Sequence, residues 1–299
     1  MLQVYTKSVL GFLCLLYCAC ASTATGSAPA RQLATQPLMT TWTAEYVRQD
    51  VSISWQHARV YLPFTTTPTT LDRITAGKRW PVVLFMHGCW GFETQEHSDW
   101  GKFFAAQGLL VIMPDSFARP NHKRRCETID DHGGVHPPVH DMRLAEIAYA
   151  KQQIEKQPWY DGKNLFLMGY SEGAIAAVRT PLRGFRGVIA ASWTCTHRGY
   201  APLHGIFLPP ETPLLTLSYD NDSWFPQENL KGNCGQRMAG RLASRHITLP
   251  SQSELHRLMH KVDQRWLNIF NTQGHNHGTF HDAQARQAVD EFIHRLMRD

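Results

Sequence analysis

The chain has 299 residues, of which 43% are hydrophobic and 18% are charged, and these values are ordinary for a globular protein that buries a core. The formal net charge is +5, but the lysines and arginines are scattered along the chain. The one dense run, KRR at 123–125, is too short to indicate a nucleic-acid interface, so we expect no nucleic-acid partner.

The first 21 residues have the pattern of a secretory signal peptide. Lys7 is the only charged residue before the apolar run VLGFLCLLYCACA, and small and polar residues follow this run. The run is too short to span a bilayer, which takes about 20 residues. The pattern therefore predicts an exported protein, periplasmic or secreted.

Two outcomes of export are consistent with the end of this leader. The residues ACA at 19–21 fit an A-x-A cleavage site, which would release a soluble protein. Alternatively, Cys20 resembles the acceptor of a bacterial lipoprotein signal, with the signal ending before it, although Tyr17 stands where leucine is usual. We expect contact with a membrane only if Cys20 carries a lipid. Residues 22–40, rich in Ser, Thr, Ala and Pro, predict a flexible lead-in.

Four cysteines remain after the leader: Cys89, Cys126, Cys195 and Cys234. An even number in an oxidising compartment predicts two disulfides, for which three connectivities are open. No pair has the C-x-x-C spacing, so a structural zinc site is not expected.

The first part of the predicted domain contains strands and one helix. VSISWQ (51–56) alternates apolar and polar residues as a half-buried strand does, and ARVYLP (58–63) is a second candidate strand. WPVVLFMHG (80–88) is a continuous apolar run that stops at a glycine, which predicts a strand buried on both faces. SDWGKFFAAQG (98–108) has helical spacing, and LLVIMPD (109–115) is another buried strand.

A long loop is predicted over residues 116–139, which contain paired glycines and paired prolines, and an amphipathic helix follows at 140–157. Further strands are predicted at 164–168, 187–192, 213–218 and 265–270, and further helices from about 172 and at 235–246, 252–263 and 282–298. Alternating buried strands and helices predict an α/β fold around a mostly parallel sheet. Because no linker follows residue 40 and no repeat is present, we expect one domain over 41–299.

The stretch GYSEG at 169–173 places a serine between two glycines, after the predicted strand and before a helix of small residues. This is the setting of the G-x-S-x-G nucleophile turn, which holds a serine hydroxyl above the sheet at a helix N-terminus. Flanking side chains would clash in so tight a turn, which explains Gly169 and Gly173. Ser171 is therefore the candidate nucleophile.

A serine nucleophile needs a base and a third group that orients the base. Asp220 and Asp222 follow the predicted strand at 213–218, and His275 and His277 follow the predicted strand at 265–270. Their chain order, serine then acid then histidine, is that of the α/β-hydrolases. The carboxyl ends of parallel strands share one edge of a sheet, so we expect these groups to meet there.

The oxyanion of an acyl-transfer reaction needs backbone N–H donors. The turn HGCWG (87–91) follows the buried strand at 80–88 and can aim the N–H of Cys89 into the site, opposite the N–H of Glu172. We expect the Glu172 side chain itself to be solvated or salt-bridged.

These motifs together resemble the dienelactone hydrolase family of α/β-hydrolases, particularly its exported members, over residues 45–297. The resemblance rests on the stretches HGCWG, LLVIMPDSFARP with the cysteine in KRRCE, HDMRLAEIAYAK, GYSEGA, YDNDSWFP and GHNHGTF. It implies the α/β-hydrolase fold, a mostly parallel central sheet with helices on both faces.

The resemblance also implies roles for particular residues. The family's acid precedes a proline by four positions, which selects Asp222 before Pro226 and keeps Asp220 in reserve. The family's histidine follows a glycine by three positions, which selects His277 after Gly274 and keeps His275 in reserve. Neighbouring strands in the family's sheet imply two disulfides, Cys89–Cys126 and Cys195–Cys234.

The founding enzymes of the family use a cysteine nucleophile, whereas Ser171 stands in that position here, which favours a general esterase or another acyl hydrolase. We therefore expect a serine hydrolase that cleaves carboxylic esters or lactones of small molecules through an acyl-enzyme. A peptidase or acyltransferase on the same fold, and a non-catalytic exported binding protein, are the alternatives.

No cofactor and no metal are expected. The histidines His132, His136 and His140 recur at a spacing that could ligate zinc or copper, but the intervening glycines and prolines break the helix that would align them.

Overall fold

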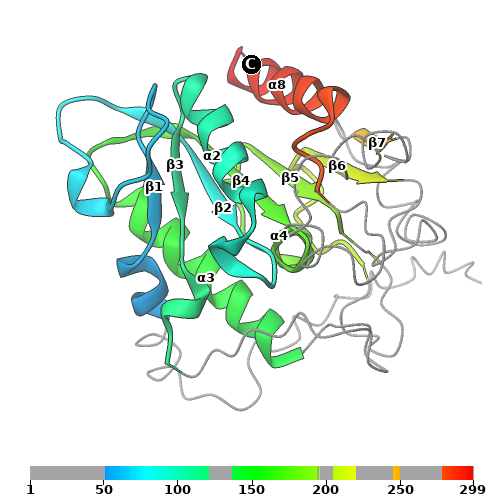
Figure 1. Ribbon diagram of the computed structural model, residues 1–299, viewed down its shortest axis with the longest axis horizontal. Coiled ribbons are helices and arrows are strands. Elements are labelled where there is room, and N and C mark those ends of the chain that lie inside the picture. The colour runs from blue at the N-terminus through cyan, green and yellow to red at the C-terminus, as the bar shows by residue number, and fades with distance from the viewer. Residues whose placement is uncertain are drawn as a thin grey trace, which may run out of the picture. The chain divides into compact units, whose positions relative to one another are not determined.

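The computed structural model describes residues 51–120, 137–193, 195, 205–219, 245–249 and 278–298. All of them belong to the compact unit Met39–Asp299. From residue 80 to residue 191, strands and helices alternate as an α/β fold requires (Figure 1). No helix within the described residues has the length and apolar character needed to cross a membrane.

The described strands form one seven-stranded sheet in the order β1-β3-β2-β4-β5-β6-β7. They are β1 (Arg59–Tyr61), β2 (Trp80–Met86), β3 (Leu110–Met113), β4 (Tyr160–Tyr170), β5 (Gly187–Ala191), β6 (Leu214–Tyr219) and β7 (Arg245–Leu249). Strand β1 runs antiparallel to β3, and every other pairing is parallel. At the centre, Met86 of β2 lies level with Gly169 of β4, so the turns that follow these two strands emerge side by side.

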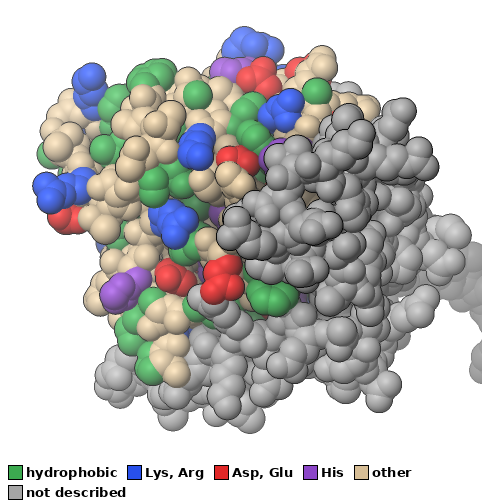
Figure 2. Space-filling view, in the orientation of Figure 1, with side chains coloured by type: hydrophobic (Ala, Val, Ile, Leu, Met, Phe, Trp, Pro, Cys, Tyr) green, Lys and Arg blue, Asp and Glu red, His purple; other side chains and the backbone are tan. Residues whose placement is uncertain are grey.

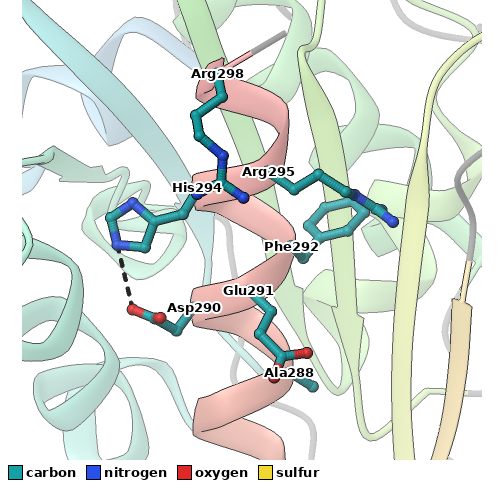
Figure 3. A pocket seen from close by; sticks show the side chains of 7 residues that line it. All are labelled: Ala288, Asp290, Glu291, Phe292, His294, Arg295 and Arg298. Carbon is teal, nitrogen blue, oxygen red and sulfur yellow. Dashed lines mark ion pairs between the residues drawn. The ribbon is translucent and has the colours of Figure 1, made fainter.

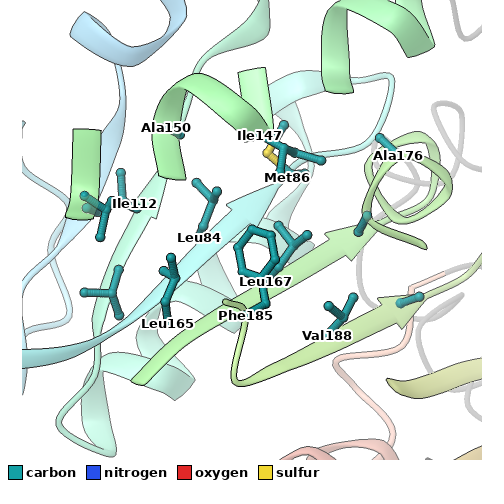
Figure 4. Packing of buried hydrophobic residues seen from close by; sticks show 14 of the residues in the cluster. Leu84, Met86, Ile112, Ile147, Ala150, Leu165, Leu167, Ala176, Phe185 and Val188 are labelled. Carbon is teal, nitrogen blue, oxygen red and sulfur yellow. The ribbon is translucent and has the colours of Figure 1, made fainter. Parts of the chain in front are cut away.

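Alternate residues of the central strands enter two separate cores. Leu84 and Met86 point into a cluster completed by side chains of α3 (Pro137–Glu155) and α4 (Glu172–Arg179), shown in Figure 4. Val83 and Phe85 point into a second cluster, completed by side chains of α2 (Gln95–Ala106) and α8 (Ala283–Arg298). Helices therefore cover both faces of the sheet, and the predicted α/β-hydrolase architecture is confirmed.

Three short 3₁₀ turns complete the described elements: η1 (Leu71–Arg73), η2 (Gly91–Glu93) and η3 (Ser116–Ala118). The side chain of Asp115 begins η3 by accepting the N–H of Phe117 at 2.9 Å. This bond turns the chain at the carboxyl end of β3.

The prediction of a strand at 51–56 was wrong, because these residues are helical. Val51 and Ser54 are the buried positions of this helical segment, three residues apart, and the Ser54 hydroxyl donates to the Val51 carbonyl at 2.9 Å. The alternation of VSISW therefore does not reflect a two-residue period of burial.

The predicted helix at 235–246 also needs correction at its end, because residues 245 and 246 open strand β7. The sequence HITL at 246–249 alternates polar and apolar residues, and the backbone of β7 pairs with that of β6 from Leu215 to Tyr219. The predicted helix at 252–263 and strand at 265–270 lie outside the described residues.

Lysine and arginine side chains stand apart from one another on the face of the described part that Figure 2 presents. A cavity of about 370 Å³ lies against the last helix, lined by Ala288, Asp290, Glu291, Phe292, His294, Arg295 and Arg298 (Figure 3). Its lining comes from α8 alone, with an ion pair between His294 and Asp290 at 3.3 Å. None of the predicted site residues contributes to it.

Candidate active site

Ser171 lies in a sharp turn between β4 and α4 and has an unusual backbone conformation, with φ 54° and ψ −121°. Its N–H donates to the Ala191 carbonyl at 2.9 Å, and its own carbonyl accepts the N–H of Ala174 at 2.9 Å as the first turn of α4. A non-glycine residue at positive φ is strained, and such residues concentrate at functional sites. The predicted strand–serine–helix setting is confirmed.

The two glycines beside Ser171 cannot be replaced without moving the backbone. A Cβ atom on Gly169 would lie 2.3 Å from the Gly173 carbonyl oxygen. One on Gly173 would lie 2.2 Å from the Met86 carbonyl oxygen, on the neighbouring strand β2. The small residues of GYSEG therefore allow α4 to pack directly onto β4 and β2.

The turn after β2 passes close to the serine, as predicted for an oxyanion turn. A Cβ atom on Gly88 would lie 3.2 Å from the Ser171 Cβ, so the backbone of Gly88 and Cys89 runs beside the nucleophile. Glu172 follows Ser171 as the first residue of α4. Both candidate donors, the N–H groups of Cys89 and Glu172, thus belong to segments that meet at Ser171.

A buried network of charged residues lies behind these two segments. Arg143 of α3 binds Glu172 through its Nε and Nη2 atoms, at 3.1 and 2.9 Å from Oε1, which confirms the expected salt bridge of Glu172. Arg119 pairs with Glu146 of α3 at 2.9 Å and donates to the Ser116 carbonyl at 3.1 Å. The two arginines are 0–1% exposed, so each buried cation has a buried anion beside it.

The imidazole of His87 also belongs to this network. Its Nε2 lies 3.2 Å from the backbone N–H of Ser116, and because that group can only donate, Nε2 accepts. Its Nδ1 lies 2.7 Å from the Gly88 carbonyl oxygen and 3.1 Å from Nη2 of Arg143. His87 is fully buried and holds the oxyanion turn from behind.

The first turn of α2 supports the site from the opposite side of the sheet. His97 accepts the Gly88 N–H on Nε2 at 3.3 Å, and its Nδ1 lies 2.8 Å from the Thr94 hydroxyl and 3.2 Å from the Thr94 carbonyl. Burial lowers the pKa of His97 to about 4, and the positive charges of Arg59 and Arg143 also lower it. The ring is therefore neutral at physiological pH and remains an acceptor.

The neighbouring residue, Glu96, binds the segment that follows the predicted catalytic histidine. Its Oε1 accepts the N–H groups of Thr279 and Phe280, each at 2.8 Å, and the Trp100 indole N–H at 3.0 Å. Burial raises the pKa of the Glu96 carboxyl, against the opposing effect of these hydrogen bonds.

The described residues that flank the predicted acid and the predicted histidine touch each other. Tyr219, the last residue of β6, donates its hydroxyl to the Gly278 carbonyl at 3.1 Å. Asp220 and Asp222 follow Tyr219 in the chain, and His275 and His277 precede Gly278. These four side chains lie outside the described residues, so their roles stay predictions. The contact joins the two described residues that stand next to these segments in the chain.

Two tryptophans of the sequence have different surroundings. Trp193 is 1% exposed and packs in the core with α3 and α4. Trp90 follows Cys89 in the oxyanion turn and is 41% exposed, so it is available to a substrate.

Cys89 and Cys195 are each disulfide-bonded. Cys126 and Cys234 lie outside the described residues, so the pairing stays a prediction. Within the described ranges, no three His, Cys, Asp or Glu side chains gather closely enough to hold a metal ion.

Sequence reasoning missed the supporting residues. For Arg143 a signal was available, because it falls at the spacing of the buried residues His140, Ile147, Ala150 and Ile154 on the predicted helix at 140–157. A charged residue on the buried stripe of an amphipathic helix requires a buried partner. For Glu96, the nearby Trp100 gives no hint of the site, because the partners that tie Glu96 to it, Thr279 and Phe280, lie more than 180 positions away.

Solved structures of similar fold place these observations in a known class. TT1662 from Thermus thermophilus is 16% identical, with 83% of this chain and 96% of that chain covered and a TM-score of 0.53. The dienelactone hydrolase-like promiscuous phosphotriesterase P91, from metagenomic libraries, is 14% identical, with coverage of 81% and 98% and a TM-score of 0.50. The structure named m3DLH is 12% identical, with coverage of 74% and 89% and a TM-score of 0.52.

The sheet order, the serine turn and this likeness define the protein as one of α/β-hydrolase fold. Residues 70–200 match the model of the dienelactone hydrolase family, which confirms the family resemblance over the part of the chain that carries the oxyanion turn and the serine turn. No curated protein sequence matches the chain at a significant level. A dienelactone is a cyclic ester, and the family match identifies the chain as a hydrolase that acts on ester bonds.

Proposed function

We propose that the protein is a serine esterase that hydrolyses carboxylic esters or lactones of small molecules through an acyl-enzyme. The observation that carries the proposal is Ser171 itself, held at φ 54° between two glycines at the start of α4. The family match over residues 70–200 supports the reaction class. The serine in place of the founding enzymes' cysteine supports a general esterase.

The proposed reaction begins with attack of the Ser171 Oγ on the ester carbonyl carbon, while His277 takes the hydroxyl proton. Asp222 orients His277, and the N–H groups of Cys89 and Glu172 stabilise the oxyanion of the tetrahedral intermediate. Collapse of the intermediate breaks the ester bond, and the leaving alcohol takes the proton from His277. Water, deprotonated by His277, then attacks the acyl-enzyme and releases the acid.

The contact between Tyr219 and Gly278 supports this choice of partners, because it joins the residues that flank the acid and the histidine. Asp220 and His275 are the reserve acid and base. The assay is hydrolysis of p-nitrophenyl acetate by the mature protein, with Ser171→Ala, His277→Ala, Asp222→Asn and Asp220→Asn.

We expect kcat/KM to fall by about 10⁴-fold in Ser171→Ala and His277→Ala. Ser192→Ala is the matched control, because Ser192 also directly follows a strand, is buried and has a positive φ of 51°. It should keep activity within a few-fold. Equal activity of wild type and Ser171→Ala would refute the proposal, and loss in Asp220→Asn but not in Asp222→Asn would exchange the two acids.

We also propose that the protein is exported and carries the disulfides Cys89–Cys126 and Cys195–Cys234. The leader at 1–21 supports export, and the bonded state of Cys89 and Cys195 supports the disulfides. A mass map of non-reduced peptides should recover these two pairs and no free thiol. Metabolic labelling with a fatty acid, in wild type and Cys20→Ala, tests whether Cys20 carries a lipid.

A further inference from the structure

We propose that Arg143 is a positioning residue that aims both oxyanion donors, one through Glu172 and the other through Gly88. The inference rests on the proposed esterase function and deepens it. Arg143 comes from helix α3, touches no reacting atom and is fully buried. Its guanidinium nevertheless binds both segments that supply the donors.

On the side of the nucleophile, Arg143 binds the residue that directly follows Ser171. The Nε and Nη2 atoms of Arg143 donate to the same carboxylate oxygen of Glu172, at 3.1 and 2.9 Å. Glu172 begins α4, and its own N–H is the donor proposed for the oxyanion. A side chain held at two points by a rigid guanidinium restrains the backbone that carries it.

On the side of the oxyanion turn, Arg143 binds the oxygen of the peptide whose nitrogen is the other donor. Its Nη2 donates to the Gly88 carbonyl oxygen at 3.3 Å, and Nδ1 of His87 lies 2.7 Å from the same oxygen. In a trans peptide, the C=O and the following N–H point in opposite directions. Donors that hold the Gly88 oxygen from behind therefore turn the N–H of Cys89 forward, towards Ser171.

The charge of Arg143 also matters for the reaction. The carboxylate of Glu172 is 9% exposed at its side chain and lies one residue from the nucleophile, where it would oppose a developing negative charge. The guanidinium neutralises this carboxylate at close range. Arg143 therefore removes a repulsive charge and orients two attractive dipoles at once.

A matched control is available in the same network. Arg119 is as buried as Arg143 and pairs with Glu146, but its described contacts reach Ser116 and Glu146 rather than Gly88 or Glu172. Loss of Arg143 removes the cation that pairs with Glu172, and loss of Arg119 removes the closer of the two cations beside Glu146, so both substitutions should destabilise the fold. Only Arg143 should affect the oxyanion.

The experiment compares wild type, Arg143→Met and Arg119→Met in ester hydrolysis and in inhibition by an aryl trifluoromethyl ketone, whose serine adduct carries an oxyanion. Unfolding temperatures are measured in parallel. In Arg143→Met we expect kcat to fall about 10²-fold, the order seen when an oxyanion donor is lost, with KM within threefold. The inhibition constant of the ketone should rise by a similar factor. Arg119→Met should lower the unfolding temperature comparably but keep kcat within fivefold.

If Arg143→Met does not fold, the double variant Arg143→Met/Glu172→Gln replaces it. This variant has no unpaired carboxylate at position 172 but keeps the backbone N–H there, and we expect the same fall in kcat. Equal kcat in the Arg143 and Arg119 variants, or a fall in kcat without weaker ketone binding, would overturn the inference and leave the proposed function standing. A wild-type protein without Ser171-dependent hydrolysis would overturn both.

Discussion

His97 should make the stability of this protein depend on pH between 7.5 and 5. In the unfolded chain His97 takes up a proton below its ordinary pKa of 6.5, whereas burial lowers the pKa in the folded protein to about 4. The stability that this difference supplies is fully present above pH 6.5 and is lost as the pH falls towards 4. Protonation would also remove the Nε2 acceptor that holds the Gly88 N–H at 3.3 Å.

The two pKa values set the size of the effect. Linkage between protonation and folding lowers the free energy of unfolding by about 2 kcal/mol at pH 5 and about 3 kcal/mol at pH 4, relative to pH 7.5. His97→Gln supplies the comparison, because an amide oxygen near the place of Nε2 can still accept the Gly88 N–H but does not titrate. The other histidines are common to both proteins, so their contributions cancel in the difference.

Urea unfolding of wild type and His97→Gln at pH 7.5 and pH 5 measures this difference. We expect wild type to be the more stable at pH 7.5 and to lose about 2 kcal/mol of its advantage at pH 5. A difference between the two proteins that stays constant over this range would show that His97 titrates normally in the folded state. The account of its burial against the oxyanion turn would then be wrong.

Three further predictions concern other parts of the site, each measured by urea unfolding. Gly173→Ala should lower the free energy of unfolding by more than about 3 kcal/mol, because its Cβ would lie 2.2 Å from a backbone oxygen. Gly162→Ala is the comparison: Gly162 has φ +81° and open space around it, so the loss should be about 1 kcal/mol. Tyr219→Phe should lower the free energy of unfolding by about 1 kcal/mol and should also lower kcat, because it removes the hydrogen bond to Gly278. Tyr61→Phe should leave the free energy of unfolding unchanged, since the buried Tyr61 hydroxyl has no hydrogen-bond partner in the described part of the chain. Glu96→Gln should gain stability relative to wild type as the pH rises from 5 to 8, because the raised pKa of Glu96 means that its ionisation destabilises the fold; a gap independent of pH would contradict this.

The features that could be predicted from the sequence are those encoded within a few neighbouring residues. The serine turn is one, since Gly169, Ser171 and Gly173 and the strand before them lie together in the chain. The buried strands β2 and β3 are others, because each is one continuous apolar run. The prediction for residues 51–56 was wrong because their short alternating pattern is that of a strand, although the segment is helical.

The features that could not be predicted depend on contacts between distant segments. Arg143 reaches Gly88 across 55 positions and Glu172 across 29. A pattern along the chain can indicate that such a residue is buried, but it does not identify the distant carboxylate or carbonyl with which the buried charge pairs. The contact between Tyr219 and Gly278, which stand next to the segments of the predicted acid and histidine, is likewise made between residues 59 positions apart.

The parallel pairing of β2 with β4 has a consequence for how the protein becomes active during folding. Trp80 pairs with Tyr160, so the two central strands meet only after the long intervening chain has been closed into a loop. Such non-local pairing is slow compared with the formation of α3, which needs only local contacts. The oxyanion turn and the serine turn follow these two strands and face each other only when they are paired. Hydrolytic activity should therefore return late in refolding, after most of the helical signal, and a chain arrested before this step would expose two apolar strands open to aggregation.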